Sequence, residues 1–121
     1  MDITIEIQVA VFLKDFKSIV TEGRGLDAIN RETNRDALIE LNLTKRIRKK
    51  EILSLSKEDY CSGPKPDKDM PGNIWEFGKI INGEEIYIKL KIAEAGHVRI
   101  AKCISFHKAK FPLIFPLKKR K

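Results

Sequence analysis

The sequence predicts an α+β fold in which three N-terminal helices pack on an antiparallel sheet formed by the C-terminal half of the chain. Three observations lead to this prediction. Apolar residues recur at helical spacing before residue 55, an Asn82-Gly83 pair separates two strand-like segments, and 121 residues suffice for one hydrophobic core but not for two. We therefore expect a single two-layer domain over residues 1–121, with a basic tail at 118–121.

The first helix is predicted over residues 6–22. Apolar residues from Val9 to Val20 recur at a spacing of three to four, and two glycines just beyond the segment mark its end. Alternating isoleucines near the N-terminus also fit a strand, which leaves the start of this helix open. A short strand is expected next, over residues 26–31.

Two shorter helices are predicted before residue 56. The segment Thr33-Asn34-Arg35-Asp36 fits the capping-box pattern and would open the second helix, which continues to Leu41. Thr44 is the expected N-cap of a third helix with Ile47 and Ile52 on its apolar side. A basic cluster is expected on the outer side of this helix: Lys45, Arg46, Arg48, Lys49 and Lys50.

A β-hairpin is the firmest structural feature of the sequence. Strands are predicted over residues 73–81 and 84–92, and the Asn82-Gly83 pair between them is the preferred sequence of a two-residue hairpin turn. A second turn at Ala95-Gly96 precedes a third antiparallel strand over residues 98–106. These strands form a C-terminal meander.

Prolines define the two remaining segments. Residues 56–72 hold three prolines and predict a long loop, which in a small domain is often functional. Residues 111–117 hold two more, which exclude a central strand because each proline lacks a ladder donor. We expect this segment to pack as an extended edge.

Basic residues are concentrated near the C-terminus of a chain with a formal net charge of +7 and a pI near 9.5. From residue 95 onward there is no acidic residue, and the basic ones are Arg99, Lys102, Lys108, Lys110, Lys118, Lys119, Arg120 and Lys121. A basic surface attracts phosphate backbones and gains from counterion release, which indicates a polyanionic partner. Solubility, or attraction to an acidic protein, would explain the same pattern.

Several classes of protein do not fit the sequence. No stretch approaches the roughly 20 apolar residues that span a bilayer, and the N-terminus lacks a signal-peptide pattern, so we expect no membrane association and a cytoplasmic location. Cys61 and Cys103 lie far apart and only two histidines are present, which indicates neither a zinc site nor a disulfide framework. We expect free thiols, no metal and no cofactor.

The sheet region contains candidates for metal-independent RNA cleavage. This reaction requires a base for the 2′-hydroxyl, a cation for the developing phosphate charge and an acid for the leaving 5′-oxygen. The candidates are His107 and Glu76 as acid and base, Tyr87 as phosphate ligand or proton donor, and Lys89 or Lys65 as electrostatic stabiliser. Each also has a plain structural explanation, such as packing for Tyr87 and a solvated position for His107.

Neighbouring residues are candidates for RNA binding through base stacking or backbone contacts: Trp75, Phe106, Arg99, Lys102 and Lys79. Strand alternation puts Tyr87 and Lys89 on one face of their strand. The register of the hairpin decides whether Glu76 joins them or whether Trp75 and Lys79 do, and the sequence leaves this choice open. A tryptophan at this position also fits a place in the core.

An ordered set of motifs resembles the MqsR family of type II toxins. The motifs are Asp59-Tyr60-Cys61-Ser62-Gly63-Pro64, Ile74-Trp75-Glu76-Phe77-Gly78-Lys79, Glu85-Ile86-Tyr87-Ile88-Lys89-Leu90 and Cys103-Ile104-Ser105-Phe106-His107. The N-terminal part is similar to the longer branch of these toxin-like proteins, at Phe12, Phe16-Lys17, Asn34, Ala37-Leu38, Glu40-Leu41 and Leu43-Thr44. The resemblance therefore covers most of the chain.

The resemblance implies a RelE-like fold and an mRNA interferase, that is, an endoribonuclease that cleaves messenger RNA and arrests growth. It also implies inhibition by a co-encoded helix-turn-helix antitoxin, and a complex of the two proteins on promoter DNA. Tyr87 matches the tyrosine of the family's pattern. Ser62 and His107 stand at its two lysine positions and Glu76 at its glutamine, and Lys65 is the nearest substitute for the first lysine.

Two other classes of protein fit the same residues. A non-catalytic RNA- or DNA-binding module, or an inactive toxin-derived regulator, needs only the basic surface and the aromatic residues. The absence of the family's lysine and glutamine, with Ser62, Glu76 and His107 at these positions, adds some weight to this alternative. A protein-interaction domain whose basic tail binds an acidic partner is the second.

Overall fold

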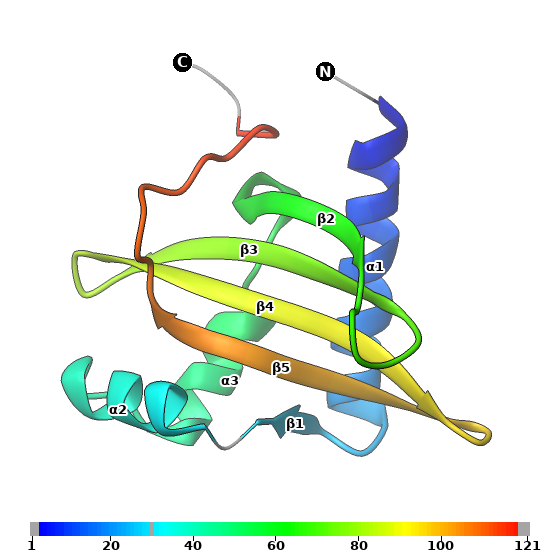
Figure 1. The fold of residues 1–121 in the computed structure, drawn as a ribbon, viewed down its shortest axis with the longest axis horizontal. Coiled ribbons are helices and arrows are strands. Elements are labelled where there is room, and N and C mark those ends of the chain that lie inside the picture. The colour runs from blue at the N-terminus through cyan, green and yellow to red at the C-terminus, as the bar shows by residue number, and fades with distance from the viewer. Residues whose placement is uncertain (1–2, 30, 119–121) are drawn as a thin grey trace.

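A mixed sheet with strand order β1-β5-β4-β3-β2 organises the computed structural model, which describes residues 3–29 and 31–118 (Figure 1). The elements in this part of the chain are α1 (Ile3–Glu22), β1 (Leu26–Ala28), α2 (Glu32–Glu40), α3 (Lys45–Leu53), the 3-10 turn η1 (Lys57–Asp59), β2 (Tyr60–Pro66), β3 (Asn73–Ile81), β4 (Glu84–Ala95) and β5 (Val98–Lys108). The α+β class predicted from the sequence is thereby confirmed, whereas the RelE-like fold stays a prediction.

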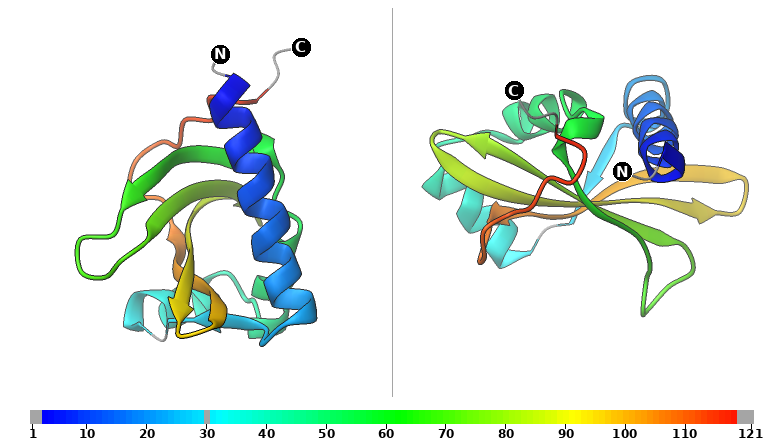
Figure 2. Two further views of the ribbon diagram at one scale, coloured as in Figure 1. Left: turned by 90° about the vertical axis from the view of Figure 1, so that its right-hand side faces the viewer. Right: turned by 90° about the horizontal axis from the view of Figure 1, so that it is seen from above.

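Helices α1 and α3 lie on one side of the sheet, and the other side carries no helix among the described residues (Figures 1 and 2). The core lies between α1 and the strands. Phe12 stacks on Trp75 with ring centroids 4.8 Å apart, and both Phe16 and Phe77 are fully buried. Burying a side chain of this size stabilises the fold by about 1.5–3 kcal/mol. No helix of the described chain combines the length and apolar character needed to cross a membrane.

The hairpin of β3 and β4 confirms the prediction from Asn82-Gly83. Both turn residues have positive φ, 52° for Asn82 and 80° for Gly83, as the favoured two-residue hairpin turns require. β4 extends three residues beyond its predicted end, and β5 extends two residues beyond the predicted Phe106. The predicted first helix is also confirmed, and it begins at Ile3 because helical packing against the sheet prevails over the alternating isoleucines.

The prediction of a purely antiparallel sheet is wrong, because β1 pairs parallel to β5 through Leu26 and Ala101. β1 is also shorter than the predicted segment of residues 26–31. A parallel pair joins segments distant in sequence, so no turn signal marks it.

The predicted loop over residues 56–72 is likewise wrong in part, because η1 and the edge strand β2 occupy most of it. An edge strand tolerates prolines on its unpaired side.

α2 lies along the β5 edge of the sheet, not on its face (Figure 1). The pairing of β1 with β5 ends at Cys103. Beyond that residue, the side chain of Asn34 in α2 bonds to the β5 backbone in place of a strand. The Asn34 side chain donates to the Ile104 carbonyl at 3.0 Å and accepts from the Phe106 amide at 3.1 Å. The predicted capping box at Thr33 is therefore wrong: the helix begins at Glu32, and Asn34 turns inward.

The predicted N-cap of α3 is confirmed, since the Thr44 hydroxyl accepts a hydrogen bond from the Ile47 amide at 3.1 Å. The sidedness of this helix differs from the prediction at two positions. Ile47 is exposed, and Arg48 is buried although the rest of the basic cluster faces solvent. The helix is only nine residues long, and Arg48 lies on the side that faces β1 and α2.

The chain after β5 crosses the sheet without joining it as a strand (Figures 1 and 2). Residues 111–117 are irregular, as their prolines predicted. Leu113 and Phe115 lie against Gly78, so closely that a Cβ atom at Gly78 would overlap Leu113. Leu117 is buried in the core. Of the predicted basic tail, Lys119, Arg120 and Lys121 lie outside the described residues.

Candidate functional site

The sheet face opposite α1 and α3, called the open face below, carries polar side chains of four strands, β2 to β5. Trp75 and Phe77 point to the core, so Glu76 points to the open face. The register pairs Glu76 with Lys89 and Tyr87 with His107. The hairpin register thus settles the choice that the sequence left open: Glu76, not Trp75, joins Tyr87 and Lys89.

Glu76 is the centre of this group. Among the described residues, the Ser62 hydroxyl and the Lys65 ammonium both donate to its Oε1, and the Tyr87 hydroxyl donates to its Oε2. The Lys65 Nζ lies 2.6 Å from Oε1. Ser62 and Lys65 come from β2, the strand that the sequence did not predict. An edge strand therefore completes the cluster on one side.

Lys89 and His107 complete the group on the other side of Tyr87. The Lys89 Nζ lies 5.9 Å from the centre of the Tyr87 ring, and the His107 ring centroid lies 5.4 Å from it. The His107 Nδ1 is 2.9 Å from the Lys108 carbonyl oxygen. A carbonyl only accepts, so Nδ1 carries a proton, and in the neutral ring Nε2 is the nitrogen able to take one up.

The hydrogen bonds fix the protonation states of Glu76 and Tyr87. Burial raises the pKa of Glu76, but hydrogen bonds from Lys65, Ser62 and Tyr87 outweigh it and lower the pKa to about 2. Burial, together with the hydrogen bond to Glu76, raises the pKa of Tyr87 well above its ordinary value. Near neutral pH, Glu76 is an anion and Tyr87 keeps its proton. Glu76 is therefore a weak base that orients its neighbours.

All five predicted catalytic residues lie in this cluster: Glu76, Tyr87, Lys89, His107 and Lys65. Four of the five predicted RNA-binding residues do not face the open side. Trp75 and Phe106 are buried in the core, which leaves no ring face for a base. Lys79 bonds to Ser54 at the end of α3, and Arg99 pairs with Asp15 of α1 at 3.2 Å, so both lie on the helix side.

Lys102 is the predicted RNA contact that does border the open face. It lines a hollow of about 580 Å³ beneath the β2–β3 loop, which Lys89 also lines. The floor includes Lys91, whose ammonium lies 2.6 Å from Asp67 of the loop and whose side chain is only 4% exposed. Because Tyr87, Lys89 and Lys91 lie two residues apart in β4, strand alternation could have placed Lys91 on this face. No pattern in the sequence indicates that the β2–β3 loop buries Lys91.

Within the Glu76 cluster, Ser62 is the residue that was not among the predicted site residues. In the sequence, Ser62 is notable only as the residue that stands at the first lysine position of the family's pattern.

Both cysteines are free, with Cys103 buried and Cys61 half-buried. Within residues 3–29 and 31–118, no three His, Cys, Asp or Glu side chains converge as metal ligands would.

Comparisons of the chain with protein-family models, with curated proteins and with solved structures found no match. The geometry therefore carries the functional argument. It defines an α+β domain with a polar cluster on the sheet face that carries no helix in the described part of the chain, centred on a carboxylate that accepts from a lysine, a serine and a tyrosine.

Proposed function

We propose that this protein is a metal-independent endoribonuclease and the toxin of a type II toxin-antitoxin system, acting on messenger RNA in the cytoplasm. One observation carries the proposal: Glu76 holds Lys65 and Tyr87 in place on the open face, with His107 and Lys89 beside the tyrosine ring. A proton carrier, a neutral hydroxyl donor and two cations thus lie within one small area. These are the groups that cleavage by the 2′-hydroxyl requires.

In the proposed reaction, His107 takes the proton of the 2′-hydroxyl through Nε2. The 2′-oxygen attacks the adjacent phosphorus, the bond from phosphorus to the 5′-oxygen breaks, and that oxygen takes a proton from Tyr87. The products are a 2′,3′-cyclic phosphate and a 5′-hydroxyl end. Lys65 and Lys89 balance the charge that develops on the phosphate oxygens. Tyr87 regains a proton from solvent, and His107 releases the one it took.

The test is cleavage of single-stranded RNA by purified variants. We expect His107→Ala to lower the cleavage rate by about 10²–10⁴-fold, the usual contribution of a positioned proton carrier. Tyr87→Phe removes the hydroxyl donor but keeps the ring, and should also slow cleavage. His97→Ala is the matched control, because His97 is exposed in the turn between β4 and β5. Near-wild-type cleavage by both site variants would remove the catalytic assignment.

A non-catalytic RNA-binding module is a second candidate, and one observation favours it. The Glu76 carboxylate already accepts from Ser62, Lys65 and Tyr87, as a structural ion pair would. Under this alternative the wild-type protein binds RNA in a salt-sensitive way and leaves it intact, and both site variants bind equally well. Product analysis for a 2′,3′-cyclic phosphate separates the two candidates.

The toxin assignment and the antitoxin rest on the resemblance to the MqsR family. Expression of the protein in bacteria should arrest growth, and co-expression of a helix-turn-helix protein encoded next to it should restore growth. His107→Ala should be tolerated without the antitoxin. Growth arrest that persists in His107→Ala would contradict nuclease action as the cause of toxicity.

A further inference from the structure

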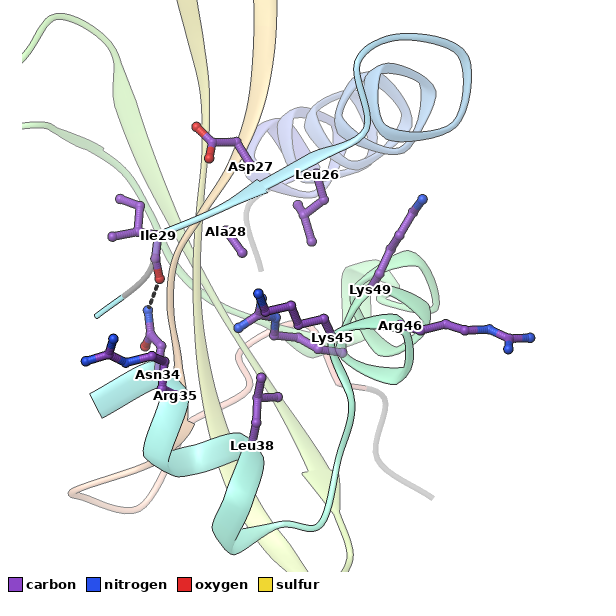
Figure 3. A pocket seen from close by; sticks show the side chains of 11 residues that line it. Leu26, Asp27, Ala28, Ile29, Asn34, Arg35, Leu38, Lys45, Arg46 and Lys49 are labelled. Atoms are coloured by element: carbon purple, nitrogen blue, oxygen red, sulfur yellow. Dashed lines mark hydrogen bonds between the residues drawn. The ribbon is translucent and has the colours of Figure 1, made fainter. Parts of the chain in front are cut away.

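A second pocket lies between β1, α2 and α3, away from the open-face cluster (Figure 3). Its volume is about 430 Å³. Three groups of residues line it, namely the residues of β1 and its end, those of α2 and those of α3: Leu26, Asp27, Ala28, Ile29; Asn34, Arg35, Leu38; Lys45, Arg46, Arg48 and Lys49. None of these belongs to the Glu76 cluster.

Arg48 is the unusual residue of this pocket. Only 6% of it is exposed, and its buried Nε has no hydrogen-bond partner. Within the described part of the chain, its guanidinium makes no hydrogen bond or ion pair. Burial raises the pKa of the Cys103 thiol to about 12, and the charge of Arg48 acts against that rise, which places the guanidinium near β5. A buried arginine normally has a partner, because an unpaired buried charge is costly.

The charge around Arg48 is strongly positive. Arg35, Lys45, Arg46 and Lys49 also line the pocket. Figure 3 shows Lys45 reaching from α3 toward the space between β1 and α2, whereas Arg46 extends away from it. The acidic residue of the lining, Asp27, lies 3.6 Å from Lys102 and is already compensated. One carboxylate would leave most of this charge unbalanced, and a phosphate carries up to two charges and several acceptor oxygens.

The remaining lining is apolar. Leu26, Ala28 and Leu38 provide side chains against which a ring can pack, and the volume suits a ligand of mononucleotide size (Figure 3). From the unpartnered Arg48, the surrounding cations and this apolar wall, we propose that the pocket binds the phosphate of a nucleotide, with Arg48 as its central ligand. Arginine is suited to this role because its planar fork donates two parallel hydrogen bonds to phosphate oxygens.

The test measures binding of adenosine 5′-monophosphate to the full chain by calorimetry at about 0.1 M salt, where surface charges are partly screened. We expect saturable one-to-one binding. Arg48→Met should weaken it at least tenfold, and Arg35→Met, a change at the exposed rim, should weaken it too. Arg24→Met is the matched control because Arg24 is exposed and does not line the pocket. Adenosine, which lacks the phosphate, should not bind measurably.

Stability separates a ligand-binding role of Arg48 from a structural one. With no bound phosphate, Arg48→Met should leave Tm unchanged or raise it, since it removes an uncompensated buried charge. The mononucleotide should raise Tm of the wild type and not of Arg48→Met. A lower Tm for Arg48→Met, together with unchanged binding by Arg35→Met, would overturn the proposal in favour of a structural arginine.

Three further arms identify the ligand and the site. Lys65→Met should bind the mononucleotide normally; loss of binding there would assign the ligand to the Glu76 cluster instead. Inorganic phosphate should bind more weakly than the mononucleotide, and equal affinity would reject a nucleotide. A glutamate-rich peptide should compete poorly. Tight peptide binding that the mononucleotide does not displace would show that an acidic protein occupies the pocket. This proposal stands or falls independently of RNA cleavage by His107.

Discussion

Asn34 is a buried amide whose polar atoms all bond to backbone groups. Only 2% of the residue is exposed, and it donates to the carbonyls of Ile29 and Ile104 and accepts from the amide of Phe106. It thereby joins the start of α2 to the free edge of β5. One polar side chain replaces a missing length of strand.

Replacing this amide should be costly. We expect Asn34→Ala to lower the free energy of unfolding by at least about 2 kcal/mol, because each buried group left without a partner costs roughly 1–3 kcal/mol. Urea denaturation measures the change. Thr33→Ala is the control, since Thr33 is exposed in the same helical turn. Equal stabilities of the two variants would show that water replaces the amide.

Glu76 makes stability depend on pH in the acid range. Its pKa is lowered in the folded state to about 2, against an ordinary 4.5, by its hydrogen bonds and despite its burial. A carboxylate with a lowered pKa stabilises the fold fully above its unfolded pKa, and this contribution is lost as pH falls through the folded pKa. We therefore expect unfolding free energy to fall between pH 4.5 and 2 more steeply in the wild type than in Glu76→Gln. Parallel curves from urea denaturation would contradict the ion-pair role.

Strand alternation alone could have predicted half of this residue-scale arrangement. It placed Tyr87 and Lys89 on one face, and the register then added Glu76 to them. It also shows why the assignment of Lys79 to RNA binding was wrong. Trp75, Phe77 and Lys79 lie two residues apart in β3 and share one face, so Lys79 lies on the helix side with the two buried aromatic residues. The positive charge of a side chain says nothing about the face on which it lies.

At the scale of elements, the segment of residues 111–117 depends on a glycine in β3. Gly78 has no side chain on the open face, and Leu113 and Phe115 occupy the space that a Cβ would need. This contact holds the segment beside Tyr87, the register partner of Gly78. The glycine is required here for close approach and not for backbone freedom.

We expect Gly78→Ala to lift this segment from the sheet. Overpacking of this kind costs about 1–3 kcal/mol. Amide hydrogen exchange should increase within residues 111–117 and stay unchanged in the hairpin turn of β3 and β4. The double variant Gly78→Ala/Leu113→Ala should recover part of the loss relative to the sum of the single changes, because the second change removes the overlapping group. Strict additivity would place the strain elsewhere.

Elements with a local signal were the ones that the sequence predicted. The Asn82-Gly83 turn and the Thr44 cap act within a few residues, and both are present as expected. The predicted short strand is present as β1, but its parallel pairing with β5 has no local signal because the two segments are distant in sequence. β2 was missed although its partner β3 is the next strand in the chain. Prolines in residues 56–72 suggested a loop, although the unpaired side of an edge strand accepts them.

At the scale of the whole molecule, the net charge of +7 predicted a polyanionic partner but not where it binds. Three separate groups of cations can be distinguished among the described residues. Lys65, Lys89 and Lys102 border the open face, Arg48 and its neighbours line the pocket beside β1, and Lys14 and Lys50 are exposed on α1 and α3. Substitutions in each region should therefore have a different effect on the binding of a polyanion.

Salt dependence of RNA affinity tests which region contacts RNA. Each neutralised phosphate of a single strand contributes about 0.7 to the slope of log affinity against log salt. If RNA lies on the open face, Lys89→Gln/Lys102→Gln should reduce the slope by about 1.4. Lys14→Gln/Lys50→Gln, a pair of exposed changes on α1 and α3 with the same change in net charge, should leave it unchanged. Equal reductions in both pairs would show that RNA responds to the net charge and not to the open face, and would remove the spatial basis for placing cleavage at Glu76, Tyr87 and His107.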